Sequence, residues 1–171
     1  EVGGSLEDSK KTLRYLLKPV PIMIILMMIL LMLELQDVRK LFIIICTVPL
    51  GIIGVVWGLL FFGSTMGIMA ELGILALAGI IIRNSVVLID QIKQHLDMGM
   101  PGIKAITESA IVRFRPIMLA AFTTVLGLIP LFASDFWNAI AVTIAAGLTG
   151  ATLLTLVILP VLYAIIFKIK N

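Results

Sequence analysis

Five long apolar runs, separated by short polar segments, organise this sequence. A bilayer core of about 30 Å needs about 20 apolar residues in a helix, and each run approaches or exceeds that length. The pattern therefore predicts an all-α integral membrane fold with five transmembrane helices. Their predicted ranges are about 19–35, 41–63, 66–90, 116–134 and 136–167.

The connection between the third and fourth runs, residues 91–115, is the only long one. The glycine- and proline-containing segment 98–102 should end the preceding helix. Apolar residues then recur at helical spacing, which predicts a short cytoplasmic amphipathic helix over about 101–113. A plain connector and a regulatory element fit this segment equally well. Pro116 is suited to the first turn of a helix, so the fourth span should begin there.

Composition supports a membrane protein and excludes several other classes. The chain is 61% hydrophobic and 13% charged, whereas soluble domains have about 45–50% apolar and about 25% charged residues. A net charge of +3, scattered along the chain, gives no clustered basic face for a nucleic acid. The single cysteine, Cys46, and the single histidine, His95, form no metal-binding cluster, and we expect no metal or cofactor.

The distribution of Lys and Arg predicts a periplasmic N-terminus and a cytoplasmic C-terminus. Basic residues near the N-terminus oppose this orientation, unless a large exported domain precedes them. Residues 1–18 are polar, and we expect them to be the end of an upstream periplasmic region of a longer protein. A processed chain would begin in the same way.

The third run contains Arg83, followed at once by Asn84. A guanidinium stays charged wherever the fold places it, and a charge at the bilayer centre costs between roughly 2.5 and more than 10 kcal/mol. Arg83 is therefore either a functional buried charge or an anchor that extends to the membrane surface. Glu71 lies about 18 Å away along a straight helix, too far to pair with it. The counter-charge must come from outside this chain.

Other residues in the spans have packing roles. Gly54 and Gly58 form a GxxxG motif on the second run, and Gly147 and Gly150 lie on the fifth, where small residues allow close helix contact. Thr123 and Thr124 either bond a neighbouring helix or the carbonyl of their own helix four residues earlier.

The segments GILALAGIIIRNSVVLIDQI (73–92), VRFRPIMLAAFTTVLGLIPL (112–131) and AVTIAAGLTGATLLTLVILPVLYAI (141–165) resemble the last transmembrane helices of resistance–nodulation–division (RND) multidrug efflux permeases. Together with 38–60 and 3–9, the resemblance covers essentially the whole chain. It implies helices 8 to 12, in the C-terminal transmembrane half of a twelve-helix drug/proton antiporter.

The resemblance also implies the roles of individual residues. Arg83 and Asn84 take the place of a Lys-Asn pair that faces two adjacent aspartates on the fourth helix, and Arg113 matches a second basic residue of the proton relay. The relay threonine would fall at Ala120, so Thr123 or Thr124 must replace it, or the element is missing. The resemblance also implies that the heavy-metal branch tends to carry a carboxylate near the position of Arg83, so this arginine favours the branch that exports hydrophobic or amphiphilic drugs.

The expected partners are an N-terminal transmembrane half carrying the aspartate pair, two further copies in a homotrimer, a periplasmic adaptor and an outer-membrane channel. The expected location is the bacterial inner membrane. Two alternatives remain open: a stand-alone membrane scaffold or assembly subunit with a structural arginine, and another exporter of the superfamily, for lipid or protein.

Overall fold

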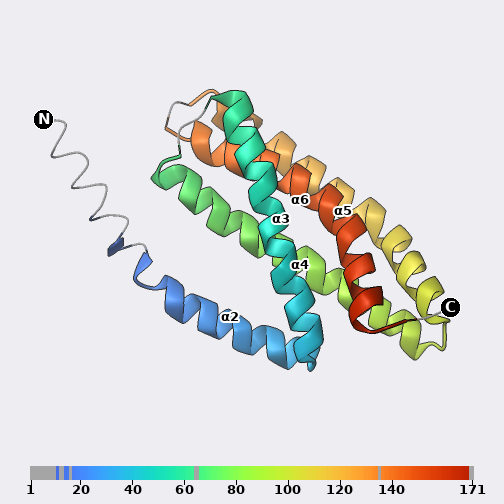
Figure 1. The fold of residues 1–171 in the computed structure, drawn as a ribbon. Coiled ribbons are helices and arrows are strands. Elements are labelled where there is room, and N and C mark those ends of the chain that lie inside the picture. Colours follow the sequence, from blue (N-terminus) through green and yellow to red (C-terminus); the bar gives the residue numbers. More distant parts are fainter. Residues whose placement is uncertain (1–10, 12–13, 16, 64–65, 135, 170–171) are drawn as a thin grey trace, which may run out of the picture. The chain divides into compact units, whose positions relative to one another are not determined.

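A computed structural model describes residues 11, 14–15, 17–63, 66–134 and 136–169, which form helices and no strands. The all-α prediction is confirmed. Most of the predicted upstream region, 1–18, lies outside the described residues. The chain divides into two compact units, Glu1–Val38 and Arg39–Asn171, and each is considered by itself. The helices in Figure 1 are α2 (Val20–Leu35), α3 (Val38–Phe62), α4 (Ile68–Asp97), α5 (Gly102–Phe132) and α6 (Asn138–Ile166).

The first unit contributes α2, an apolar helix of 16 residues. Pro19 and Pro21 lie at its start, where the missing N–H of proline breaks no helical hydrogen bond. The helix ends at Leu35, and the backbone N–H of the capping residue Gln36 donates to the carbonyl of Met32 at 3.0 Å. At 1.5 Å per residue, α2 is about 24 Å long, shorter than the bilayer core. The predicted helix is confirmed, and its crossing of the membrane stays a prediction.

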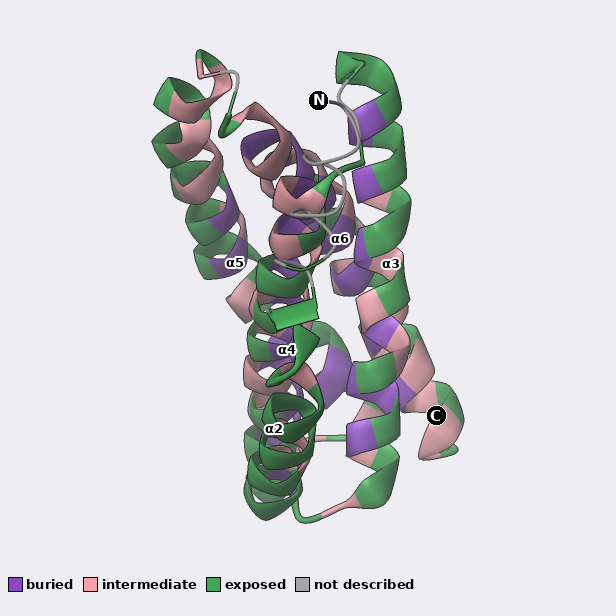
Figure 2. Ribbon diagram, turned by 90° about the vertical axis from the view of Figure 1, so that its left-hand side faces the viewer, coloured by how far each residue is buried: buried purple, intermediate pink, exposed green. Residues whose placement is uncertain are grey.

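The second unit is a bundle in which α3, α4, α5 and α6 are each long and apolar enough to cross a membrane. Buried residues follow stripes along α3, α4 and α6, as Figure 2 shows. These stripes arise because residues three and four apart share one face of a helix. Helix α4 packs on both α5 and α6, and α5 packs on α6.

Helix α3 crosses α6 where both helices carry small residues. A Cβ atom built on Gly54 would lie 2.9 Å from the carbonyl oxygen of Ala146 and 3.1 Å from the Cα atom of Gly147. A Cβ atom on Gly150 would lie 2.9 Å from the Cα atom of Gly54, and one on Gly58 would meet the side chain of Ala146. The glycines of the predicted motif therefore lie in the helix crossing, where the two backbones nearly touch.

A buried hydrogen bond joins α3 to α4 in the same unit. The Thr47 hydroxyl donates to the carbonyl of Ile44 at 2.6 Å, and its oxygen lies 3.0 Å from the hydroxyl of Ser85. Because a hydroxyl has one hydrogen, Ser85 must be the donor to Thr47. This bond satisfies two polar groups that are completely buried.

A single helix, α5, replaces two predicted elements. Residues 102–115 are helical as predicted, but they continue through Pro116 into the span, so the prediction that Pro116 begins a helix is wrong. An internal proline removes one backbone hydrogen bond and crowds the preceding turn. Here Ser109 and Ile117 are buried on either side of it, and this packing holds the two halves of α5 in one helix.

A buried histidine links the end of α4 to the start of α5. His95 Nδ1 lies 2.7 Å from the Ser109 hydroxyl, which in turn donates to the carbonyl of Ala105 at 2.6 Å. Since the serine hydrogen is already used, His95 Nδ1–H is the donor to Ser109. His95 Nε2 is then free to accept from the Gln91 amide at 3.3 Å.

We expect His95→Ala to destabilise the α4–α5 hairpin. The substitution removes a buried hydrogen bond and leaves a cavity, with an expected loss of about 1–3 kcal/mol in the free energy of unfolding. Thermal unfolding of detergent-solubilised protein, followed by circular dichroism, measures the effect. Gln94→Ala is the control because it removes the exposed hydrogen bond from Gln94 to Asp90. Equal midpoints for the two variants would contradict a structural role for His95.

Candidate functional site

A cavity of about 260 Å³ lies between α4 and α5 and brings together the site residues predicted on both helices. Arg83 and Asn84 line it from α4, and Arg113, Ala120 and Thr124 line it from α5. The other lining side chains are apolar. Two arginines thirty positions apart in the sequence therefore share one site.

Helical periodicity explains why these side chains meet. On each helix the lining residues recur at intervals of three and four, which places them on one face. These residues are Ile80, Arg83, Asn84 and Val87 on α4, and Arg113, Pro116, Ile117, Ala120, Ala121 and Thr124 on α5. The unbroken path of α5 through Pro116 carries Arg113 and Thr124 on the same face.

Both guanidiniums have unused donors. Arg113 Nε is buried without a hydrogen-bond partner. The Arg83 side chain is exposed, and it makes no hydrogen bond or ion pair with any residue that the structure describes. Guanidiniums bind carboxylates and other anions through short, charge-assisted hydrogen bonds. The cavity is thus a positively charged site that fits an anionic partner.

The two candidate hydroxyls on α5 differ in position. Thr124 lines the cavity, and its hydroxyl donates to the carbonyl of Ala120 at 2.8 Å. Thr123 lies away from the cavity on the exposed side of α5, with its hydroxyl 2.9 Å from the carbonyl of Leu119. Both therefore bond to their own helix, and only Thr124 has its side chain next to the arginines.

The described carboxylates lie elsewhere. Glu71 is in the first turn of α4, and Asp90 accepts a hydrogen bond from Gln94 at 2.7 Å. Asp135 lies outside the described residues. Within the part of the chain that the structure describes, no group of three or more His, Cys, Asp or Glu side chains is placed to hold a metal ion. An acidic partner for the arginines would have to come from another segment.

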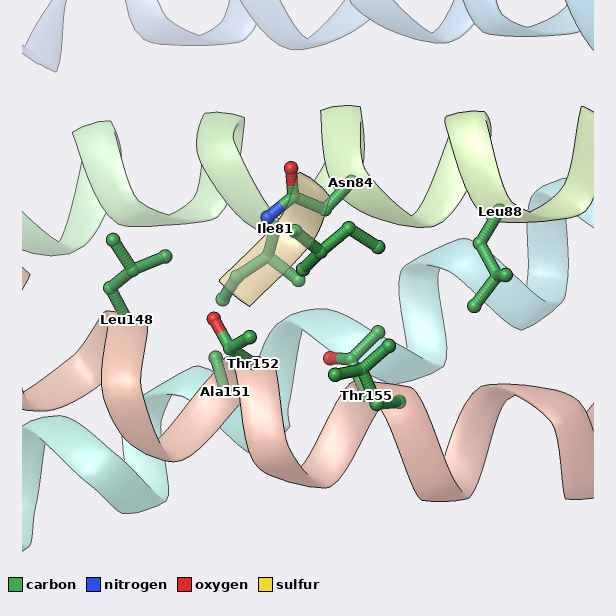
Figure 3. A pocket seen from close by; sticks show the side chains of 9 residues that line it. Ile81, Asn84, Leu88, Leu148, Ala151, Thr152 and Thr155 are labelled. Carbon is green, nitrogen blue, oxygen red and sulfur yellow. The ribbon is translucent and has the colours of Figure 1, made fainter. Parts of the chain in front are cut away.

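A second, much smaller cavity of about 10 Å³ adjoins the site between α4 and α6 (Figure 3). Asn84 lines both cavities, and Thr152 and Thr155 line the smaller one from α6. The sequence pattern did not identify either threonine. Their spacing of three residues in an apolar helix was the available signal, but it did not reveal which helix they face.

A family model described as the AcrB/AcrD/AcrF family matches residues 1–167. The nickel and cobalt resistance protein CnrA of Cupriavidus metallidurans is 31% identical, with 98% of this chain and 16% of that protein covered. The multidrug resistance protein MdtC of Erwinia amylovora is 32% identical, with 75% of this chain and 13% of that protein covered.

A solved structure of a heavy metal efflux pump, crystal form II, superposes with a TM-score of 0.82 at 30% sequence identity. The match covers 95% of this chain and 16% of the pump chain. The chain thus spans about one sixth of the length of such relatives, and its fold is similar to that part of the pump.

Proposed function

The chain belongs to the AcrB/AcrD/AcrF family, and from that membership we propose that it forms part of a proton-driven RND efflux permease. In this role it is a secondary active transporter, with Arg83, Asn84 and Arg113 on the basic side of a transmembrane proton relay. The observation that carries the proposal is that both arginines, from different helices, line one cavity with donors still available.

The acidic side of the relay comes from the N-terminal transmembrane half of the same transporter, as an adjacent pair of aspartates. An ionised aspartate at the cavity accepts hydrogen bonds from Arg83, whose planar guanidinium can hold a carboxylate through two parallel bonds. The Asn84 amide supplies a further donor beside it. Such pairing offsets the cost of keeping a guanidinium among apolar helices.

Protonation drives the conformational change in this scheme. A proton on the aspartate removes its negative charge and with it the attraction to Arg83 and Arg113. The arrangement of α4 and α5 around the cavity then becomes less stable than an alternative packing, and the equilibrium shifts. Release of the proton to the other side of the membrane restores the ion pair and the first arrangement.

Thr124 is the hydroxyl that we assign to this relay in place of a threonine at Ala120. It lines the cavity one helical turn further along α5, and a hydroxyl can donate and accept at once. Thr123 faces away from the arginines and is the weaker candidate.

The substrates we propose are hydrophobic or amphiphilic small molecules. The relatives named above include a metal resistance protein and a multidrug resistance protein, so their names do not decide between metal ions and drugs as substrates. The cavity, however, has two fixed positive charges and no lining carboxylate among the described residues. The resemblance places a carboxylate near the position of Arg83 in the heavy-metal branch, so a basic residue here favours the drug branch.

The proposed assembly is a homotrimer in the bacterial inner membrane, joined to a periplasmic adaptor and an outer-membrane channel. In this orientation the N-terminus is periplasmic and the C-terminus cytoplasmic. The loop between α4 and α5 then lies in the cytoplasm.

Replacing Arg113 tests the proposal, with Arg115 as the matched control. Arg113 lines the cavity, whereas Arg115 is exposed two residues further along α5. We expect Arg113→Ala to lower proton-coupled transport by at least about tenfold, since hydrogen bonds to charged groups contribute about 1.5–3 kcal/mol each. Arg115→Ala should change it by less than about twofold, as usual for an exposed charge.

The measurement is efflux of a hydrophobic fluorescent dye from cells that express the full-length transporter, at equal membrane levels of each variant. An Arg113→Ala transporter that effluxes dye as well as the Arg115→Ala transporter would remove Arg113 from the relay.

A further inference from the structure

Two threonines on α6 differ from the other threonines that the structure describes in this bundle. Elsewhere the hydroxyl donates to a carbonyl of its own helix three or four residues earlier, as is common in membrane helices. This is so at Thr47, Thr107, Thr123, Thr124, Thr143 and Thr149. The Thr152 and Thr155 hydroxyls make no hydrogen bond, although the side chains are only 4% and 6% exposed.

Both hydroxyl oxygens are completely inaccessible to outside solvent, so bulk water does not satisfy them. A buried polar group without a partner is costly, and nearly all such groups in folded proteins have one. Neither hydroxyl is bonded to a carbonyl of α6, and both side chains line the same cavity. The partner must therefore lie in the space that these hydroxyls face.

That space is the cavity of about 10 Å³ between α4 and α6. Figure 3 shows Thr152 and Thr155 on α6 and Asn84 on α4 on opposite sides of it, with the Ile81 side chain between the two helices. A cavity needs at least about 10–15 Å³ of accessible space to hold one water molecule, and a buried water needs two to four polar partners. Two hydroxyls and one amide meet that requirement.

We propose that Thr152, Thr155 and Asn84 form a binding site for one ordered water molecule, which fixes the Asn84 amide beside Arg83. The consequence for transport rests on the proposed function; the water site itself does not. Asn84 lines both cavities, so an amide held from the α6 side presents a fixed donor to the larger one. Thr152 and Thr155 are positioning residues, which act on the relay through Asn84.

The chemistry of the site selects water over a cation. Its three polar groups are neutral, and no carboxylate, imidazole or thiol lines the cavity. Mg²⁺ and Ca²⁺ take six or more oxygen ligands, usually including carboxylates. A single water has two hydrogens and two lone pairs, enough for one hydrogen bond with each of these three groups.

An experimental structure of the full-length transporter, at a resolution that shows ordered water, tests the site directly. We expect density for one water within about 3.2 Å of Thr152 Oγ1, Thr155 Oγ1 and the Asn84 amide. The density should disappear in the Thr152→Val, Thr155→Val double variant. A dry cavity in the unmodified protein, or direct bonds from both hydroxyls to other groups, would overturn the proposal.

Transport measurements test the positioning role. Thr152→Val keeps the shape of the side chain and removes its hydroxyl, and we expect about three- to tenfold slower dye efflux, as for the loss of one hydrogen bond. Thr152→Ser restores the hydroxyl and should recover at least half of the rate. Thr149→Val is the control, because the Thr149 hydroxyl bonds only to the carbonyl of Ala145.

If Thr152→Val reduces the amount of folded protein, the efflux rate of Thr155→Val, which removes the other hydroxyl, is compared with that of Thr149→Val instead. Equal rates for Thr152→Val and Thr149→Val would refute the positioning role, and so would a failure of Thr152→Ser to recover transport. The two proposals fail in different ways. Undiminished transport after removal of Arg83 would refute the relay and leave the water density in place, whereas a dry cavity would leave the relay in place.

Discussion

Replacing Arg83 by alanine is expected to abolish proton-coupled transport while the protein remains in the membrane at its normal level. The substitution removes the guanidinium from the cavity and would leave the aspartate that we propose as its partner without a counter-charge. Removing one partner of a buried ion pair typically costs about 3–5 kcal/mol, which corresponds to a loss of at least about a hundredfold. Arg83→Lys should retain measurable transport. Lysine keeps the positive charge and loses only the bidentate hydrogen bonding of a guanidinium to a carboxylate.

The measurement is proton movement in proteoliposomes that contain the full-length transporter, recorded with a pH-sensitive dye after addition of substrate. Lys93→Ala is the matched control, since Lys93 is an exposed basic residue further along α4 and does not line the cavity. Full coupling in the Arg83→Ala protein would show that this guanidinium only anchors α4 at the membrane surface. Equal loss in Arg83→Lys and Arg83→Ala would instead mean that arginine geometry, beyond its charge, is needed.

The helices of this chain were predictable because a bilayer imposes a length. Apolar runs of about 20 residues predicted α3, α4 and α6 with ends within a few residues of those observed, except that α4 continues to Asp97. The course of α5 was not predictable from local rules. A proline favours a helix start, but tertiary packing at Ser109 and Ile117 outweighs that preference.

The site was predictable to the extent that its residues are charged. A guanidinium inside an apolar run is conspicuous in any sequence, and the resemblance supplied a role for Arg83 and Arg113. The cavity that unites them depends on the rotation of α4 and α5 about their axes, which the sequence pattern does not determine. Thr152 and Thr155 were missed for the same reason. Threonine is common in membrane helices, and only side-chain geometry shows that these two leave their own carbonyls unused.

The second large effect is expected at the α3–α6 crossing, where Gly54→Leu should disrupt the bundle. A Cβ atom at this position would lie 2.9 Å from the carbonyl oxygen of Ala146 and 3.1 Å from the Cα atom of Gly147. These are backbone atoms, so no side-chain rotation relieves the overlap and the two helices must separate. Overpacking typically costs about 1–3 kcal/mol, and we expect the upper end of that range or more.

Gly127→Leu on α5 is the matched control, because no atom of another residue that could clash lies within 4 Å of a Cβ atom built there. Thermal unfolding in detergent should show a midpoint several degrees lower for Gly54→Leu than for the unmodified protein, with less folded protein recovered from membranes. The control should unfold near the original midpoint, since leucine is the better helix former. Equal midpoints would mean that α3 can shift along α6 without loss of contact. A lower midpoint for Gly54→Leu alone would identify the GxxxG surface as a contact that holds α3 against α6.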